Sequence, residues 1–211
     1  MPAQRIHLIR HGEVHNPGGV LYGRLPHFRL SDRGHGMAEA AALEIKGQKR
    51  AVSAIFHSPL LRTRESAEHV EKVFGLDAKT DERLIEPWNI FEGRKLSGSH
   101  ILIRPNLYFH LRNPMRPSWG EPYEAIANRM LAAIEDAYNS VPDGDVILVS
   151  HQLPIVMVQR KLAGKGLAHN PKKRQCALSS ITTLERSGST FEQVDYLNPS
   201  AGLDAIDRGA V

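Results

Sequence analysis

The chain has 211 residues, of which 41% are hydrophobic and 24% are charged. This composition is typical of a globular domain and excludes disordered and collagen-like chains. No run of about 18 apolar residues is present that could cross a membrane, and the formal net charge of +4 is too small to indicate nucleic-acid binding. The single Cys176 excludes an internal disulfide, and the strand-like N-terminal run leaves no room for a signal peptide. We therefore expect a cytoplasmic protein that binds neither membranes nor nucleic acids.

In the first half of the chain, short apolar runs alternate with helix-forming segments bounded by caps and glycines. Ser31 has the position of a helix N-cap, and Gly47 and Gly75 have the positions of residues that end helices. We expect strands at 5–10, 51–57 and 78–80, loops at 11–30 and 82–93, and helices from Ser31 to Gly47 and from Ser58 to Gly75.

The second half of the chain continues this alternation. The run at 145–150 is apolar throughout, which is typical of a central strand that is buried on both faces. Helices are expected at 122–139 and 154–162, and the alternating segments 176–185 and 190–197 predict an antiparallel hairpin at a sheet edge. The pattern predicts an α/β fold, a three-layer α/β/α sandwich with a mostly parallel sheet and an antiparallel edge.

Residues 94–120 differ in composition from the rest of the chain. They are rich in proline, and they include the arginines Arg104, Arg112 and Arg116 and the large aromatic residues Tyr108, Phe109 and Trp119. We interpret this segment as a lid-like insertion, with one short helix near 101–110, in a single domain spanning 1–211. At least one of its arginines is expected to bind a distal anionic group of a ligand, whereas local packing is the more common role for its aromatic residues.

Three predicted strands end in side chains that suit an anionic ligand. Arg10 and His11 follow the first strand, His151 follows the central strand, and Arg62 lies near the start of the helix after the second strand. Because the carboxyl ends of strands in an α/β sheet form one crevice, these residues are expected to meet there. Two arginines and two histidines beside a helix N-terminus predict a pocket for a dianionic phosphoryl group.

Each of these features has a less specific interpretation. A histidine at the end of a strand is more often structural than catalytic, and the spacing of His7, His11 and His15 would suit zinc only on a helix. The run Lys172-Lys173-Arg174 resembles a nucleic-acid-binding patch but is more typical of a solvated turn. The order of the three strand ends is what favours the phosphoryl pocket.

These motifs resemble the histidine phosphatase superfamily, which includes phosphoglycerate mutases and small broad-specificity phosphatases. The resemblance covers roughly residues 5–165 and rests on Leu-Ile-Arg-His-Gly-Glu at 8–13, Ser-Pro-Leu-Leu-Arg-Thr at 58–63, Leu-Ile-Glu at 84–86, Phe-Glu-Gly at 91–93 and Val-Ser-His at 149–151. It implies a phosphoglycerate mutase-like fold.

The resemblance also implies a two-step phosphoryl transfer through a phosphohistidine on His11. Arg10, Arg62 and His151 would bind the phosphoryl oxygens, and Glu86 would act as general acid and then general base. Asn16 would add a hydrogen bond to the phosphate, and Gly23, Arg24 and Gln152 are further expected substrate-binding residues. These cationic side chains would neutralise the charge that a metal otherwise neutralises, so we expect no metal and no cofactor.

The sequence departs from the common family pattern at three places. Gln152 follows the second histidine where glycine is usual, and could add an amide contact to the pocket. The stretch from Glu86 to Gly93 is one residue shorter than the frequent arrangement, and it ends in Phe-Glu-Gly where Trp-Glu-Gly is typical. This leaves Glu92 as an alternative general acid. The 94–120 segment does not match the mutase insertion.

The favoured interpretation is a metal-independent phosphomonoesterase acting on a small phosphorylated metabolite. A phosphoglycerate mutase-type transferase is the nearest alternative, and an inactive phosphate-binding module is a more distant one. The sequence leaves the natural substrate open, and the oligomeric state could be a monomer or a homodimer.

Overall fold

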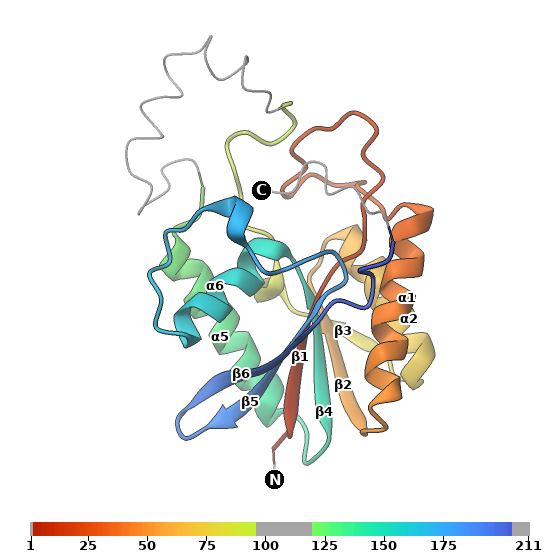
Figure 1. The fold of residues 1–211 in the computed structure, drawn as a ribbon, viewed down its shortest axis with the longest axis vertical. Helices are drawn as coiled ribbons and strands as arrows, with labels where there is room; N and C mark the ends of the chain where they lie inside the picture. The colour runs from red at the N-terminus through yellow and green to blue at the C-terminus, as the bar shows by residue number, and fades with distance from the viewer. Residues whose placement is uncertain (1, 96–119, 204–211) are drawn as a thin grey trace.

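The computed structural model describes residues 2–95 and 120–203, and six strands in these ranges form one mixed sheet (Figure 1). Its order is β3-β2-β4-β1-β5-β6. The strands β1 (Arg5–Arg10), β2 (Val52–His57), β3 (Ala78–Thr80) and β4 (Asp145–Ser150) are parallel, whereas β5 (Ile181–Ser187) and β6 (Thr190–Leu197) are antiparallel to their neighbours. The predicted mostly parallel sheet with an antiparallel edge is confirmed.

Helices cover both faces of this sheet, as predicted for a three-layer sandwich. In Figure 1, α1 (Asp32–Gly47) and α2 (Leu61–Phe74) lie on one side, and α5 (Tyr123–Asn139) and α6 (Gln152–Leu162) lie on the other. Two short 3₁₀ turns, η1 (Glu82–Leu84) and η2 (Pro171–Lys173), interrupt segments expected to be loops.

The alternation of side chains along β4 divides the core into two parts. Val146 and Leu148 pack with α5 and α6, whereas Ile147 and Val149 pack with α1 and α2. All four are at most 1% exposed. Burial of each such side chain stabilises the fold by about 1.5–3 kcal/mol, which explains why an all-apolar strand takes the central position.

A buried charged group lies at the other end of the same strand. Asp145 is fully buried and accepts two hydrogen bonds from Arg50, at 2.6 and 2.8 Å. His7 of β1 joins this group through Nε2, which lies 3.3 Å from Asp145 Oδ2, and through Nδ1, which lies 3.0 Å from Thr183 Oγ1. His7 therefore belongs to this buried hydrogen-bonded group and not to a zinc site with His11 and His15.

Three element boundaries differ from the prediction. The second helix begins at Leu61 and not at Ser58, because Ser58 to Leu60 form a turn that the hydroxyl of Thr63 closes through the carbonyls of Ser58 and Leu60. The helix after β4 begins at Gln152, two residues before Pro154, since a proline in the first turn costs no intrahelical hydrogen bond.

The third difference concerns the edge hairpin. Strand β5 begins at Ile181 and not at residue 176, because residues 176–180 pack against the end of β1 instead of pairing as a strand. Ser179 has a φ of 53°, and its N–H donates to the carbonyl of His11 at 3.3 Å.

The predicted lid and its helix at 101–110 fall mainly in residues 96–119, outside the described residues. Arg104, Arg112 and Arg116 lie there, so their expected contact with a ligand stays a prediction. Among the helices that the structure describes, none is long and apolar enough to span a membrane.

Two glycines bring the loop after β1 into contact with the first turn of α1. A Cβ atom on Gly12 would lie 2.3 Å from the carbonyl oxygen of Gly34, and one on Gly34 would lie 2.0 Å from the carbonyl oxygen of Glu13. Both clashes are with backbone atoms, which cannot move aside as a side chain can. The residues around His11 therefore depend on this close backbone approach.

We expect Gly34→Ala to destabilise the protein by about 2 kcal/mol or more, because the added methyl group must push two backbone segments apart. Gly36→Ala is the matched control, since Gly36 lies in the same helix and its Cβ would meet nothing within 4 Å. The control should gain about 0.5–1 kcal/mol from reduced chain entropy. Urea unfolding measures both free energies, and a neutral Gly34→Ala variant would contradict the assigned contact.

Candidate active site

The two histidines of the site are placed by the pairing of β1 with β4. Arg10 of β1 is in register with Ser150 of β4, so His11 and His151 follow at adjacent strand ends. The N–H of His11 donates to the carbonyl of Ser150 at 3.1 Å, and the two imidazole ring centroids lie 5.2 Å apart. The predicted meeting of the two strand ends is therefore present in the structure.

His11 is held in one orientation by its own loop. Its Nδ1 lies 2.7 Å from the carbonyl oxygen of Gly12. A carbonyl oxygen only accepts hydrogen bonds, so Nδ1 carries a proton and donates it. Nε2 therefore keeps the lone pair of the neutral ring, and it accepts a hydrogen bond of 3.3 Å from Nε of Arg62. Burial and the charges of Arg62 and Arg10 hold the pKa of His11 well below its usual range, so the ring is neutral at pH 7.

Arg10 and Arg62 are both 1% exposed, which is rare for arginine. Arg10 donates to the carbonyl of Cys176 at 2.8 Å, and Arg62 donates to the carbonyl of Gly23 at 2.8 Å. The Arg62 guanidinium also lies over the ring of Tyr22, at 4.8 Å from its centroid. Two buried cations beside a neutral histidine form a strongly electropositive pocket that suits a dianionic group.

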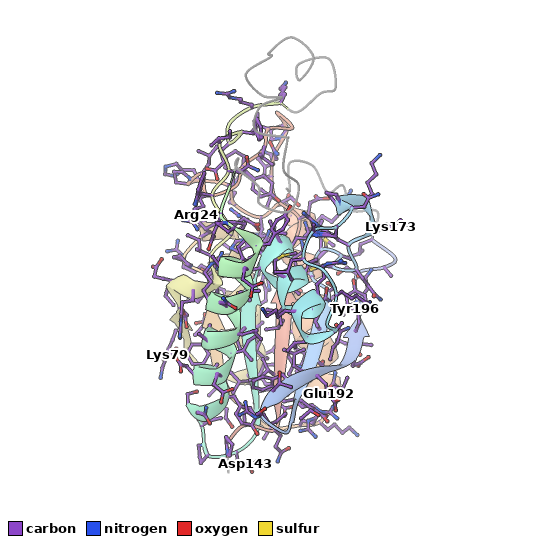
Figure 2. The ribbon with its side chains drawn as sticks, turned by 90° about the vertical axis from the view of Figure 1, so that its left-hand side faces the viewer. Arg24, Lys79, Asp143, Lys173, Glu192 and Tyr196 are labelled. Carbon is purple, nitrogen blue, oxygen red and sulfur yellow. The ribbon has the colours of Figure 1, made fainter. Side chains whose placement is uncertain are left out.

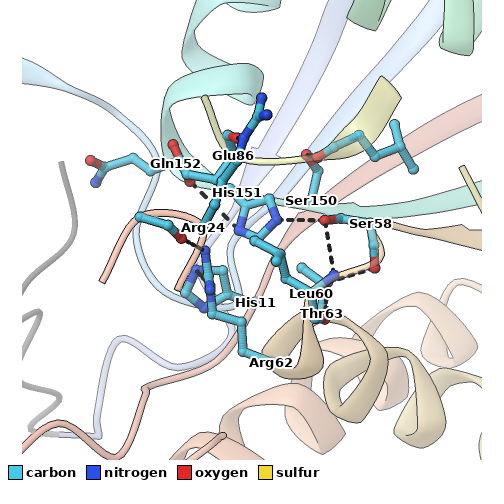
Figure 3. Close-up of polar contacts among 12 residues, drawn as sticks. His11, Arg24, Ser58, Leu60, Arg62, Thr63, Glu86, Ser150, His151 and Gln152 are labelled. Atoms are coloured by element: carbon cyan, nitrogen blue, oxygen red, sulfur yellow. Dashed lines mark hydrogen bonds and ion pairs between the residues drawn. The ribbon is translucent and has the colours of Figure 1, made fainter. Parts of the chain in front are cut away.

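His151 lies between Ser58 and Glu86 (Figure 3). Its Nε2 is 2.7 Å from Ser58 Oγ, and its Nδ1 is 3.5 Å from Glu86 Oε2. Ser58 Oγ also accepts from the N–H of Leu60 at 3.5 Å, and its hydroxyl hydrogen can donate to His151 Nε2. With Ser58 as that donor, the proton of the neutral ring is on Nδ1, the nitrogen nearer to Glu86. Burial, with the charge of Arg62, holds the pKa of His151 well below its usual range.

Glu86 is 5% exposed and follows η1. Burial raises its pKa to about 7, although Arg62, Arg10, Arg174 and Arg129 act in the opposite direction. Its Oε1 makes no hydrogen bond with the described residues. A buried carboxyl with this pKa exchanges its proton near neutral pH, as a general acid and base must.

Four further described residues were predicted to bind substrate, and each of them makes hydrogen bonds with other residues of the protein. Asn16 donates to the carbonyl of Val20 at 2.8 Å and accepts from the N–H of Val20 at 3.2 Å, which closes the loop after His11. Gly23 has a φ of 39°, and its carbonyl accepts from Arg62. Asn16 and Gly23 are thus beside the pocket and support the loop that forms its wall.

Arg24 and Gln152 also border the pocket. The Nε of Arg24 donates to the carbonyl of Glu86 at 2.6 Å, which fixes the backbone of that residue. The amide of Gln152 accepts from Arg174 at 3.0 Å and donates to the carbonyl of Cys176 at 3.4 Å. Direct contact of these four residues with substrate stays a prediction.

Glu92, the alternative general acid, has a different environment. Its Oε1 accepts from the N–H groups of Arg24 and Asn89, at 3.1 and 3.0 Å. A Cβ on Gly23 would lie 2.2 Å from the same oxygen, so the carboxylate packs directly on the backbone of the 23–24 loop. This geometry suits a structural carboxylate, whereas Glu86 faces His151.

Comparison with known proteins agrees with this geometry. A family model described as "Histidine phosphatase superfamily (branch 1)" matches residues 6–199. The chain belongs to this superfamily.

Individual relatives and structures support the same assignment. An uncharacterised protein of Mycobacterium tuberculosis, Rv0525, is 44% identical over 203 residues, which cover 95% of this chain and 100% of that protein. A protein of Thermoplasma acidophilum named 2,3-bisphosphoglycerate-dependent phosphoglycerate mutase is 38% identical over 151 residues, 70% of each chain. The fold is similar to that of a phosphoserine phosphatase from Entamoeba histolytica, solved with 3-phosphoglyceric acid. The two structures have a TM-score of 0.74 and 20% sequence identity, and the match covers 91% of this chain and 95% of the other.

Sequence reasoning missed two polar residues of this histidine phosphatase site. Ser58 appeared in a motif, but its contact with His151 was not foreseen, because the helix was expected to begin at that residue. Arg174 was interpreted as part of a solvated basic turn, which is wrong. Its guanidinium donates to Gln152 at 3.0 Å and to His169 Nε2 at 2.9 Å, and its burial lowers its pKa. No local pattern distinguishes Arg174 from the exposed lysines before it.

The described residues contain no group of three or more His, Cys, Asp or Glu side chains that could hold a metal ion. The polar groups around His11 are instead cations and a single buried carboxyl, a set of side chains that suits an anion.

The raised pKa of Glu86 has a cost in stability. In the unfolded chain this carboxyl has an ordinary pKa near 4.5, so the folded state is fully favoured below that pH and loses stability as pH rises to about 7. We expect Glu86→Gln, which has no charge to bury, to be about 1–3 kcal/mol more stable than the parent chain at pH 8 and to differ little at pH 4.

Urea unfolding at the two pH values measures this difference. Glu92→Gln is the control, since that carboxylate accepts backbone hydrogen bonds and its neutralisation should bring no gain. A gain for Glu86→Gln that is the same at both pH values would contradict a charge effect.

Proposed function

We propose that the protein is a metal-independent phosphomonoesterase that hydrolyses a small phosphorylated metabolite through a phosphohistidine on His11. The observation that carries the proposal is the state of His11. Its Nδ1–H is held by the carbonyl of Gly12, its Nε2 meets the buried Arg62, and the charge of the buried Arg10 also acts on the ring. A neutral imidazole with a fixed tautomer and an available lone pair is a nucleophile at neutral pH.

In the first step, the Nε2 lone pair of His11 forms a bond to phosphorus as the bond to the ester oxygen breaks. Arg62 exchanges its hydrogen bond to Nε2 for one to a phosphoryl oxygen, and Arg10 and His151 Nδ1–H bind the others. The electrostatic stabilisation of the three equatorial oxygens is the main task of such a site. Protonated Glu86 gives its proton to the leaving oxygen.

In the second step, a water molecule attacks the phosphohistidine. Glu86, now a carboxylate, takes a proton from the water as its oxygen bonds to phosphorus, and the P–N electron pair returns to Nε2 of His11. Inorganic phosphate leaves, and Glu86 is protonated again for the next cycle. A pKa of about 7 suits both roles of this carboxyl.

A phosphoglycerate mutase-type transfer is the alternative, and the 38% identity to a protein named as such a mutase favours it. The two reactions share the first step and differ in whether water or a second hydroxyl group accepts the phosphoryl group. Phosphate release from 3-phosphoglycerate without formation of 2-phosphoglycerate would favour the phosphatase. An inactive phosphate-binding module is disfavoured by the complete set His11, Arg10, Arg62, Glu86 and His151.

We expect His11→Ala to abolish turnover and the formation of an acid-labile phosphoenzyme, because His11 is the described imidazole whose Nε2 lone pair meets Arg62. Rapid quenching with labelled substrate measures the phosphoenzyme. His15→Ala is the control, since His15 is exposed on the same loop and should keep both properties. Labelling of His11→Ala at the level of the parent chain would overturn the assignment.

Glu86→Gln should lower kcat on alkyl phosphates by about 10²–10⁴, because an alkoxide cannot leave without a proton. The burst of p-nitrophenol from p-nitrophenyl phosphate should fall far less, since that leaving group departs as an anion. In the parent chain, activity on alkyl phosphates should decline above a pH of about 7, as Glu86 loses its proton, and Glu86→Gln should lack this decline.

Glu92→Gln is the matched control for this experiment. It removes one carboxylate from the same loop, but that carboxylate faces the backbone of the 23–24 loop. If Glu92→Gln showed the dependence on leaving group and Glu86→Gln did not, Glu92 would be the acid.

A further inference from the structure

A second cavity lies beside the candidate active site, along α6. It has a volume of about 490 Å³ and lies between α6, the 163–175 segment with η2, and β6. Val156 and Gln159 of α6, and Ala163 directly after the helix, face it. None of its described lining residues belongs to the catalytic set, so it is distinct from the phosphoryl pocket.

The charges around this cavity are of one sign. Arg160, Lys165, Lys173 and Arg174 line it, and no Asp or Glu does so among the residues that the structure describes. The remaining polar lining consists of amide side chains and His169, whose pKa is lowered by burial and by the charges of Arg174 and Arg160. Four cationic side chains around a cavity of this size, with no Asp or Glu among its described lining residues, attract an anion.

The two arginines donate hydrogen bonds to other residues of the protein, whereas the two lysines donate none to the described residues. Arg160 donates to the carbonyls of Gly166 and Ala168, which holds the 163–168 segment against α6. The Nζ atoms of Lys165 and Lys173 make no hydrogen bond or ion pair with another described residue. Both lysines are exposed, and Lys173 lies at the same end of the molecule as Arg24 (Figure 2). Their ammonium groups can therefore turn to a ligand without breaking a contact.

Arg174 connects this cavity with the phosphoryl pocket. It lines the cavity and donates to Oε1 of Gln152, and Gln152 directly follows His151. The amide of Gln152 also reaches the carbonyl of Cys176, which accepts from Arg10. An anion that draws the guanidinium of Arg174 towards the cavity would therefore change the position of Gln152 at the edge of the pocket.

We propose that this cavity binds a second anionic group, a phosphate or a carboxylate, and that its occupant acts on the reaction through Arg174 and Gln152. Lys165 and Lys173 provide ammonium groups for the anion, and Arg174 provides the link. The group belongs either to the substrate itself, as a distal anion, or to a separate small anion. Binding does not depend on the proposed phosphatase activity, whereas the effect on turnover does.

Binding is tested by NMR on the ¹⁵N-labelled full chain. Inorganic phosphate is titrated in, and the chemical shift of each backbone amide is followed. The amides of residues 163–175 report the cavity, and the amide of Gly12 reports the phosphoryl pocket. We expect saturable shifts at both places. The double variant Lys165→Gln/Lys173→Gln should weaken binding at 163–175 by about tenfold, the loss of two exposed charge contacts, and leave binding at Gly12 within about twofold.

The matched control is Lys79→Gln/Lys172→Gln, which removes the same charge from two exposed lysines that do not line the cavity. The proposal is overturned if the shifts at 163–175 do not saturate across the millimolar range, or if both double variants weaken binding there equally. Saturable shifts at Gly12 alone would also overturn the proposal, because phosphate would then bind in the phosphoryl pocket and not in the cavity. A protein without activity would still give a result, so failure here is distinguishable from failure of the proposed function.

Kinetics distinguish the two sources of the anion. If the occupant is part of the substrate, Lys165→Gln/Lys173→Gln should raise KM for 3-phosphoglycerate several-fold and spare p-nitrophenyl phosphate, which has no second anion. If it is a separate anion, malonate should change kcat/KM for p-nitrophenyl phosphate in the parent chain and not in the double variant. If neither effect is found where binding saturates, the link through Arg174 is wrong.

Discussion

The parallel pairing of β1 with β4 is the constraint on which the rest of the site depends. Because Arg10 is opposite Ser150, the next residue of each strand is a histidine, and the two rings are neighbours. A shift of one residue would turn every side chain of β1 to the other face of the sheet. The apolar alternation of Ile6, Leu8 and Ile9 between the two halves of the core therefore also fixes where His11 lies relative to His151.

This constraint allows the protein to bury charges that would otherwise stay in water. Arg10 and Arg62 are almost completely buried, and for Arg62 the carbonyl of Gly23 and the nearby carboxyl of Glu86 offset only part of the cost of burial. Their field keeps His11 and His151 neutral, while burial keeps the proton on Glu86 near pH 7. Buried positive charge of this kind reduces stability and suits a dianionic ligand, a combination that is common where a site gives up stability for function.

Loops from distant parts of the chain complete the pocket that the strands begin. The 176–180 segment supplies a carbonyl to Arg10 and an N–H to the carbonyl of His11, and the turn at Ser58 supplies a hydroxyl to His151. Glu92 holds the 23–24 loop, whose Gly23 carbonyl receives Arg62. The two carboxylates of the 86–93 loop thus have different tasks, because one faces the phosphoryl pocket and the other faces backbone N–H groups.

Much of this arrangement was predictable from local patterns. Apolar runs, helix caps and glycines placed most elements, and the order of Arg10-His11, Arg62 and His151 at strand ends predicted that they meet, because parallel strands end at one edge of a sheet. Residues whose roles depend on the strands that carry them can be predicted in this way.

Only the tertiary structure decided which other side chains reach the pocket. Arg174 is half-buried and donates to Gln152, whereas Lys172 is exposed, although both belong to one basic run. Gln152 contacts Arg174 and the carbonyl of Cys176, which are more than twenty positions away in sequence. Glu86 and Glu92 differ in role through the loops that each one faces. The sequence by itself determined the strand-end residues through local periodicity and caps, whereas contacts between loops follow from packing across the sheet, which no local pattern records.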